Sequence, residues 1–133
     1  RGNNSTGSSG SSKTTKVYGE AYYNNILANS LDGQTEVSLT YEYGTVGNTP
    51  RSASVRIDII TDEYVIEGGL DKRSSLDSLQ QAVFAATLTD KKPAVATYDT
   101  DNQWGKYEHR IWQVAQRLGI RFIWVSQGKI MEK

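Results

Sequence analysis

Two acidic residues stand in neighbouring apolar runs near the middle of this 133-residue chain. Asp58 lies inside the run VRIDII, and Glu67 ends the following run YVIE. If residues 62 and 63 form a hairpin turn, the two acids face each other on paired strands, where Cβ atoms are only about 4.5–5.5 Å apart. Two carboxylates this close repel each other, and hard divalent ions bind carboxylate oxygens. The spacing predicts a Mg²⁺ or Mn²⁺ site that activates water against a phosphodiester; two ordinary solvent-facing acids are the alternative.

Other polar residues are candidates for the same site. Glu36 opens a strand on its polar side and is a candidate further metal ligand. Gln80 and Gln81 lie on an expected helix, from which they can position a substrate. The basic pair Lys72-Arg73 can contact phosphate groups. Each of these residues also fits an ordinary solvated surface position.

The apolar periodicity predicts the elements that must position these residues. In chain order they are a helix at 17–31, strands at 36–43, 54–61 and 64–67, a helix from Ser74 or Ser75 to about 88, a strand at 94–98, a helix at about 103–118 and a strand at 120–125. Residues 44–51 contain two glycines and a proline and are expected to form a loop. The second and third helices are expected to pack against the sheet through their apolar side chains, which are Leu76, Leu79, Val83, Phe84, Tyr107, Ile111, Val114, Ala115 and Leu118. The order α-β-β-β-α-β-α-β predicts an α/β fold, with a mixed sheet flanked by helices on both faces.

Composition limits the class of protein. Fifteen basic and fifteen acidic residues cancel, so nucleic acid would be bound by local positive patches rather than by net charge. The chain has no cysteine and a single histidine, His109, which excludes disulfides, a cysteine nucleophile and a metal site with two imidazoles. Residues 1–15 carry no apolar side chain and are expected to form a flexible polar arm or linker, followed by one domain at 16–133. The chain has no apolar run long enough to span a bilayer, and its first residues lack the apolar core of a secretory signal. We therefore expect no membrane partner, and a location that is cytoplasmic or not defined by the sequence.

The motifs, taken in order, resemble the PD-(D/E)XK nuclease superfamily, the restriction-endonuclease-like fold. The resemblance rests on GQTEV, RIDIIT, YVIE, LQQAVFAA and KKPAV, and it covers about residues 17–125. It implies a metal-dependent nuclease with Mg²⁺ or Mn²⁺, in which Asp58 and Glu67 correspond to the catalytic acids of the second and third strands. Glu20 corresponds to an acid that many members place on the first helix. Gln80 and Phe84 are similar to the Q-x-x-x-Y helix of the recombination-exonuclease branch.

One position departs from the family pattern. The lysine of the E-x-K motif would stand at residue 69, where this chain has Gly69. Lys72, three residues further on, is expected to reach back into the site and to supply the missing positive charge. Nucleic acid is the expected partner, with DNA favoured over RNA, and a homodimer is an option. The alternatives are a non-catalytic nucleic-acid-binding or assembly module of the same fold, or a toxin nuclease domain held by an inhibitor or immunity protein.

Overall fold

A computed structural model describes residues 18–133 of the chain. The expected polar arm at 1–15 lies outside the described residues. The elements are α1 Glu20–Leu31, β1 Gln34–Val46, β2 Thr49–Ile60, β3 Tyr64–Leu70, the 3₁₀ helix η1 Arg73–Asp77, α2 Ser78–Thr89, β4 Lys92–Tyr98, α3 Lys106–Leu118, β5 Arg121–Ser126 and β6 Lys129–Glu132. The α/β class is confirmed, and η1 and the edge strand β6 are additions to the predicted elements.

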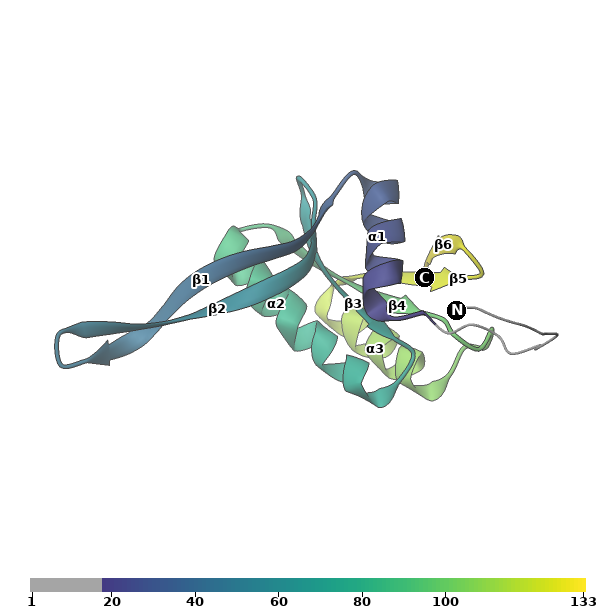
Figure 1. Cartoon of the computed structure of the whole chain (residues 1–133). Helices are drawn as coiled ribbons and strands as arrows, with labels where there is room; N and C mark the ends of the chain where they lie inside the picture. The colour runs from purple at the N-terminus through teal and green to yellow at the C-terminus, as the bar shows by residue number, and fades with distance from the viewer. Residues whose placement is uncertain (1–17) are drawn as a thin grey trace, which may run out of the picture.

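The six strands form one mixed sheet in the order β1-β2-β3-β4-β5-β6. The pairs β1–β2, β2–β3 and β5–β6 are antiparallel, whereas β3, β4 and β5 run parallel. Helices α2 and α3 connect the parallel strands and pack side by side on one face, and α1 covers the other face (Figure 1). The parallel strands are therefore buried on both sides, which explains their continuous apolar sequence.

Three apolar clusters hold the helices to the sheet, and the third joins Ala85 of α2 to Ile57 and Val65. On the α1 face, Leu27 and Ala28 pack with Ile66 and Tyr98. On the other face, Ala82 of α2 and Ile111 of α3 pack in a cluster with strand residues. Alanines carry much of this contact, and the prediction of inward-facing residues was wrong at three larger side chains, which are 42–60% exposed: Val83, Val114 and Leu118.

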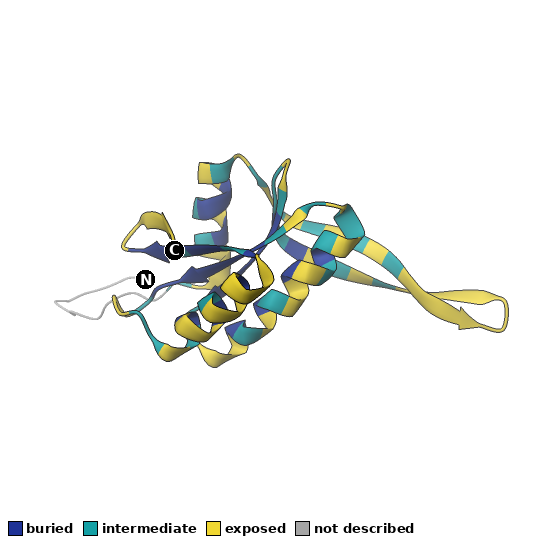
Figure 2. Ribbon diagram, turned by 180° about the vertical axis from the view of Figure 1, so that it is seen from behind, coloured by how far each residue is buried: buried dark blue, intermediate teal, exposed yellow. Residues whose placement is uncertain are grey.

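The predicted loop at 44–51 is wrong. The paired strands continue to Val46 and Thr49 and turn at Gly47, whose φ of 62° suits glycine. The β1–β2 hairpin extends well away from the body of the protein (Figure 1), and its outer part is exposed on all sides (Figure 2). Backbone pairing rather than burial holds this part together, so the apolar alternation that marks a half-buried strand is missing there.

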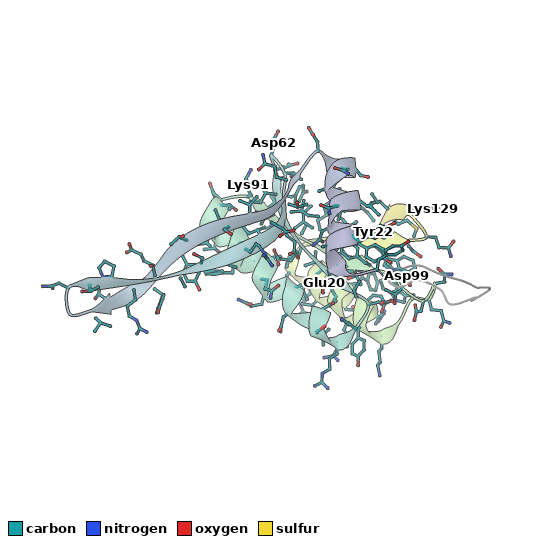
Figure 3. All side chains as sticks on the ribbon, viewed as in Figure 1. Glu20, Tyr22, Asp62, Lys91, Asp99 and Lys129 are labelled. Carbon is teal, nitrogen blue, oxygen red and sulfur yellow. The ribbon has the colours of Figure 1, made fainter. Side chains whose placement is uncertain are left out.

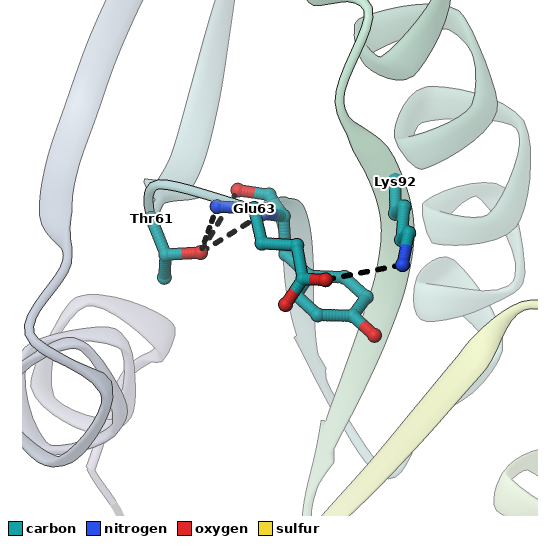
Figure 4. A network of polar contacts seen from close by, with 4 residues as sticks. Thr61, Glu63 and Lys92 are labelled. Carbon is teal, nitrogen blue, oxygen red and sulfur yellow. Dashed lines mark hydrogen bonds and ion pairs between the residues drawn. The ribbon is translucent and has the colours of Figure 1, made fainter.

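Side-chain contacts fix the turn between β2 and β3. Thr61 Oγ1 accepts hydrogen bonds from the backbone N–H groups of Glu63 and Tyr64, at 3.3 and 2.9 Å. The Glu63 carboxylate forms an ion pair of 3.0 Å with Lys92 at the start of β4 (Figure 4). The turn at residues 62 and 63 sets the register of the two acid-bearing strands.

The start of the second helical segment differs from the prediction that Ser74 or Ser75 caps it. η1 comes first and α2 begins at Ser78, with no side-chain cap at its N-terminus. The Ser75 hydroxyl instead donates to the carbonyl oxygen of Leu70, at the end of β3. Ser75 therefore ties η1 to the strand that carries Glu67.

Candidate active site

Asp58 and Glu67 line one pocket of about 330 Å³. Glu20 from the first turn of α1 lines it as well, together with Ser75 of η1 and Gln81 of α2. Figure 3 shows Glu20 at the end of α1 that lies near the centre of the molecule. Three acidic side chains from three separate elements therefore share one pocket.

The two strands separate at the acids. The β2–β3 ladder contains only the pairs Ile59–Ile66 and Ile60–Val65. Beyond Ile59 and Ile66, bonds from backbone N–H groups to side-chain carboxylates replace the backbone pairing. The Asp58 N–H donates to Glu67 Oε2 at 3.1 Å, and the Gly68 N–H donates to Asp58 Oδ2 at 2.9 Å. The two carboxylates lie next to each other, as the hairpin register predicted.

A local twist of β1 and β2 accompanies this separation. Glu36 has a φ of 56°, which side-chain-bearing residues rarely adopt, between the pairs Thr35–Ile59 and Val37–Ile57. Ile59 packs in the cluster on the α1 face, whereas Ile57, two residues earlier, packs with Val65 and Ala85. The normal alternation of faces is interrupted where Asp58 turns toward the pocket.

Burial and mutual repulsion disfavour ionisation of the acids. The pKa of Glu67 is raised from 4.5 to about 8, mainly by burial and in part by the negative charges of Asp58 and Glu20. The pKa of Asp58 is also raised, mainly by burial, although the Gly68 N–H and Arg56 act in the opposite direction. Burial and the charge of Asp58 raise the pKa of Glu20, and Lys72 lowers it. The site therefore favours either protons or a bound cation.

The donor set suits a hard divalent cation. One oxygen of Asp58 and one of Glu67 accept backbone N–H groups, which fix both carboxylates. Within residues 18–133, the second oxygen of each has no recorded hydrogen bond, and both side chains line the pocket. Carboxylate oxygens are the ligands that Mg²⁺ and Mn²⁺ take in proteins, so Asp58 and Glu67 are the residues of this pocket that could hold such an ion.

The other candidate residues from the sequence, Gln80, Gln81 and Glu36, line the pocket of Asp58 and Glu67 or a neighbouring one. Gln81 lines the acidic pocket, whereas Gln80 lines a neighbouring groove with Tyr41 and Phe84. Glu36 is exposed and forms an ion pair of 3.7 Å with Arg56. Glu36 also lines an adjoining pocket with Asp58 and Glu20, so it lies beside the acidic pair.

The structure gives a steric reason for the departure at Gly69. A Cβ atom at this position would lie 2.4 Å from Ser75 Oγ and 2.7 Å from Ser75 Cβ. A lysine at residue 69 therefore requires Ser75 to move. Lys72, the expected substitute, is exposed, and it is not among the residues that line the pocket.

Arg56 is a basic residue of the site that sequence reasoning missed. It lines both the acidic pocket and the adjoining pocket, and it lowers the pKa of Asp58. Arg56 stands two residues before Asp58 on the same strand. Because residues two apart in a strand point to the same side, the sequence could have indicated that Arg56 lies beside Asp58. Ser74 and Ser78 also line the pocket, and nothing in their residue type or spacing predicted this position.

Comparisons of the chain with protein-family models, with curated proteins and with solved structures find no match. In the part of the chain that the structure describes, no helix has the length and apolar character needed to cross a membrane.

Proposed function

We propose that this protein is a metal-dependent nuclease that hydrolyses phosphodiester bonds of nucleic acid. The observation that carries the proposal is the pair of adjacent carboxylates, Asp58 and Glu67, fixed by backbone hydrogen bonds in a pocket shared with Glu20. The order of a helix, three antiparallel strands, a helix and a parallel strand supports the resemblance to the restriction-endonuclease-like fold.

Asp58 and Glu67 would hold one or two Mg²⁺ or Mn²⁺ ions through their remaining oxygens. Such an ion lowers the pKa of a bound water and stabilises negative charge on the phosphate. The backbone N–H groups of Asp58 and Gly68 orient the two carboxylates before the substrate arrives. Glu20, whose carboxyl has a raised pKa, would accept a proton from the attacking water or hold that water.

Positive charge near the scissile phosphate would come from Arg56. It is the basic side chain among the described pocket-lining residues, and a guanidinium binds phosphate with two parallel hydrogen bonds. Lys72 would act at longer range, since its charge lowers the pKa of Glu20 from outside the pocket. Gln81 would contact the substrate at the rim, with Gln80 in the neighbouring groove.

The projecting β1–β2 hairpin suits a duplex substrate. A two-stranded ribbon fits the major groove of B-DNA, which is about 12 Å wide. The hairpin carries Arg51 near its tip, stacked on Tyr43 at 4.9 Å from the ring centroid. Because β2 continues from this hairpin directly to Asp58, a duplex held by the hairpin would lie close to the pocket. This arrangement favours DNA over RNA, since the deep, narrow major groove of A-form RNA excludes such a ribbon.

Cleavage assays with purified variants test the proposal. Plasmid DNA and a structured RNA would each be incubated with Mg²⁺, with Mn²⁺ and with EDTA. Asp58→Asn and Glu67→Gln are each expected to abolish metal-dependent cleavage, because each removes a charged ligand without changing the side-chain shape. Asp90→Asn is the matched control, since Asp90 is an exposed acid outside the pocket. Full activity in either pocket variant would contradict the assignment.

A second function is favoured by the crowding at Gly69. Because Ser75 occupies the space beside this position, the site lacks the motif lysine, and the same fold would then serve as a non-catalytic nucleic-acid-binding or assembly module. A filter-binding assay separates the two functions. Binding of DNA with no cleavage under any metal condition would support the module, whereas cleavage lost in Glu67→Gln supports the nuclease.

A further inference from the structure

A second group of acids lies at the carboxyl ends of the parallel strands. Asp71 follows β3, Asp99 and Asp101 follow β4, and Glu108 lies in the first turn of α3. Figure 3 shows Asp99 well away from the β2–β3 turn that carries Asp62. None of the four residues lines the pocket of Asp58, so the group is separate from the proposed active site.

The four carboxylates converge on one point. One oxygen from each lies within 4.8 Å of the corresponding oxygens of the other three, and this is the one such group of three or more metal-ligating side chains among residues 18–133. Asp99 is 7% exposed and Glu108 is 1% exposed. None of the four forms a salt bridge in the described part of the chain. Their charge therefore has no basic partner there.

Hydrogen bonds from the loop after β4 and from the end of β5 hold two of the acids, Asp71 and Asp99, in place. Both oxygens of Asp71 accept from Thr100, from its N–H at 2.9 Å and from its hydroxyl at 2.7 Å. Asp99 accepts from the Asp101 N–H at 3.2 Å and from the hydroxyl of Ser126. These contacts show how the carboxylates are oriented, and they do not by themselves identify a ligand.

Glu108 supplies the independent evidence for a ligand. Its Oε2 is buried and has no hydrogen-bond partner. The Glu108 side chain also contributes one carboxylate oxygen to the converging group. Its other oxygen, Oε1, lies at the start of the helix, where a Cβ atom added to Gly105 would be only 2.8 Å away. A buried carboxylate oxygen with no partner is costly unless a cation or a proton satisfies it.

From this geometry we infer that Asp71, Asp99, Asp101 and Glu108 form a second divalent-cation site, and that the site takes Ca²⁺. Calcium binds six to eight oxygens at about 2.3–2.6 Å, so two ligands on opposite sides of the ion are about 4.8 Å apart. The oxygens of the group, which all lie within 4.8 Å of one another, fit around an ion of this size. Magnesium needs a shorter distance of about 2.0–2.1 Å and usually keeps only one or two carboxylates.

The site would have a structural role. The ion would join the ends of β3 and β4 to the start of α3 and would fix the intervening residues 99–105.

The experiment uses the full chain with the active-site pocket disabled by Asp58→Asn and Glu67→Gln. Isothermal titration with CaCl₂ at pH 7 is expected to show one Ca²⁺ bound per chain, and adding Glu108→Gln should weaken binding at least tenfold. Asp90→Asn in the same background is the matched control and should bind as tightly as the parent. MgCl₂ in place of CaCl₂ should bind more weakly.

Thermal unfolding in EDTA and in Ca²⁺ shows whether Glu108→Gln is folded, so that a loss of binding can be assigned to the lost ligand. Glu108→Gln is expected to unfold in EDTA at a temperature no lower than its parent, because it removes the charge of a buried carboxylate whose Oε2 lacks a partner, and to lose the stabilisation by Ca²⁺. No Ca²⁺ binding at millimolar concentrations in the pocket-disabled protein would overturn the inference, as would equal binding after Glu108→Gln. Neither result bears on nucleic-acid cleavage, which is measured separately.

Discussion

The raised pKa of Glu67 makes a prediction about stability that does not depend on any substrate. The group has a pKa of about 8 in the folded protein and an ordinary value of 4.5 in the unfolded chain. Between these two values the folded state binds more protons than the unfolded state, so stability must fall as the pH rises. Each pH unit in this window costs about 1.4 kcal/mol for one such group.

The expected loss from pH 5 to pH 7 is on the order of 2–3 kcal/mol for Glu67 alone. Asp58 and Glu20 also have raised pKa values, so their contributions have the same sign. Glu67→Gln keeps the hydrogen-bond acceptor for the Asp58 N–H and removes the titrating group. The metal-free variant is therefore expected to be more stable than the wild type at pH 7 by about 2–3 kcal/mol, and about equally stable at pH 5.

Urea unfolding in EDTA at pH 5, 6, 7 and 8 measures this effect directly. Mn²⁺ should stabilise the wild type most strongly at the higher pH values, where it competes with fewer protons, and should not stabilise Glu67→Gln to the same extent. Asp90→Asn is the control and should follow the wild type at every pH. A wild type whose stability is flat from pH 5 to 8, or a Glu67→Gln protein less stable than the wild type at pH 7, would refute the electrostatic reasoning.

Three further changes test the geometry of the pocket. Gly69→Lys should lower the free energy of unfolding by about 1–3 kcal/mol through its clash with Ser75, and combining it with Ser75→Gly should remove most of that loss relative to Ser75→Gly alone, as urea unfolding would show. Arg56→Gln should reduce the rate of DNA cleavage by about 10²-fold while leaving Mn²⁺ binding measurable by calorimetry; an unchanged rate would exclude Arg56 from phosphate binding. Glu36→Gly should be more stable than Glu36→Ala by about 1 kcal/mol, the reverse of the usual preference in a strand, because of the positive φ at this position; equal stability in thermal unfolding would contradict the strained backbone.

Local patterns accounted for much of the fold. Two-residue alternation located the strands around Val37 and Ile57, and three-to-four-residue spacing located the helices. Gly119, the residue after α3, has the positive φ of a helix C-cap, which agrees with the expected end of this helix near residue 118. The same patterns failed at the outer β1–β2 hairpin, where backbone pairing replaces burial, and at Ser75, whose hydroxyl bonds to the end of β3 rather than capping a helix.

The register of the β2–β3 hairpin could be predicted from the sequence because it depends only on the few residues around the turn. Counting outward from the turn at residues 62 and 63 places Asp58 next to Glu67, and in the structure the Asp58 N–H donates directly to the Glu67 carboxylate. The position of Glu20 was available only through the resemblance, since its distance from Asp58 depends on how α1 packs across the sheet. Arg56 was overlooked even though it stands two residues from Asp58.

The sequence by itself determined the strand and helix types and the pairing of the two central acids, because both follow from periodicities and turns that span only a few residues. Only the tertiary structure decided that Ser75 excludes a side chain at Gly69 and that Asp71, Asp99 and Glu108 converge. These contacts join segments far apart in the chain, and they are set by the parallel pairing of β3 with β4 and by the packing of α3. No local pattern of residues records the distance between such segments, which is why the second acidic site emerges from the fold and not from any motif.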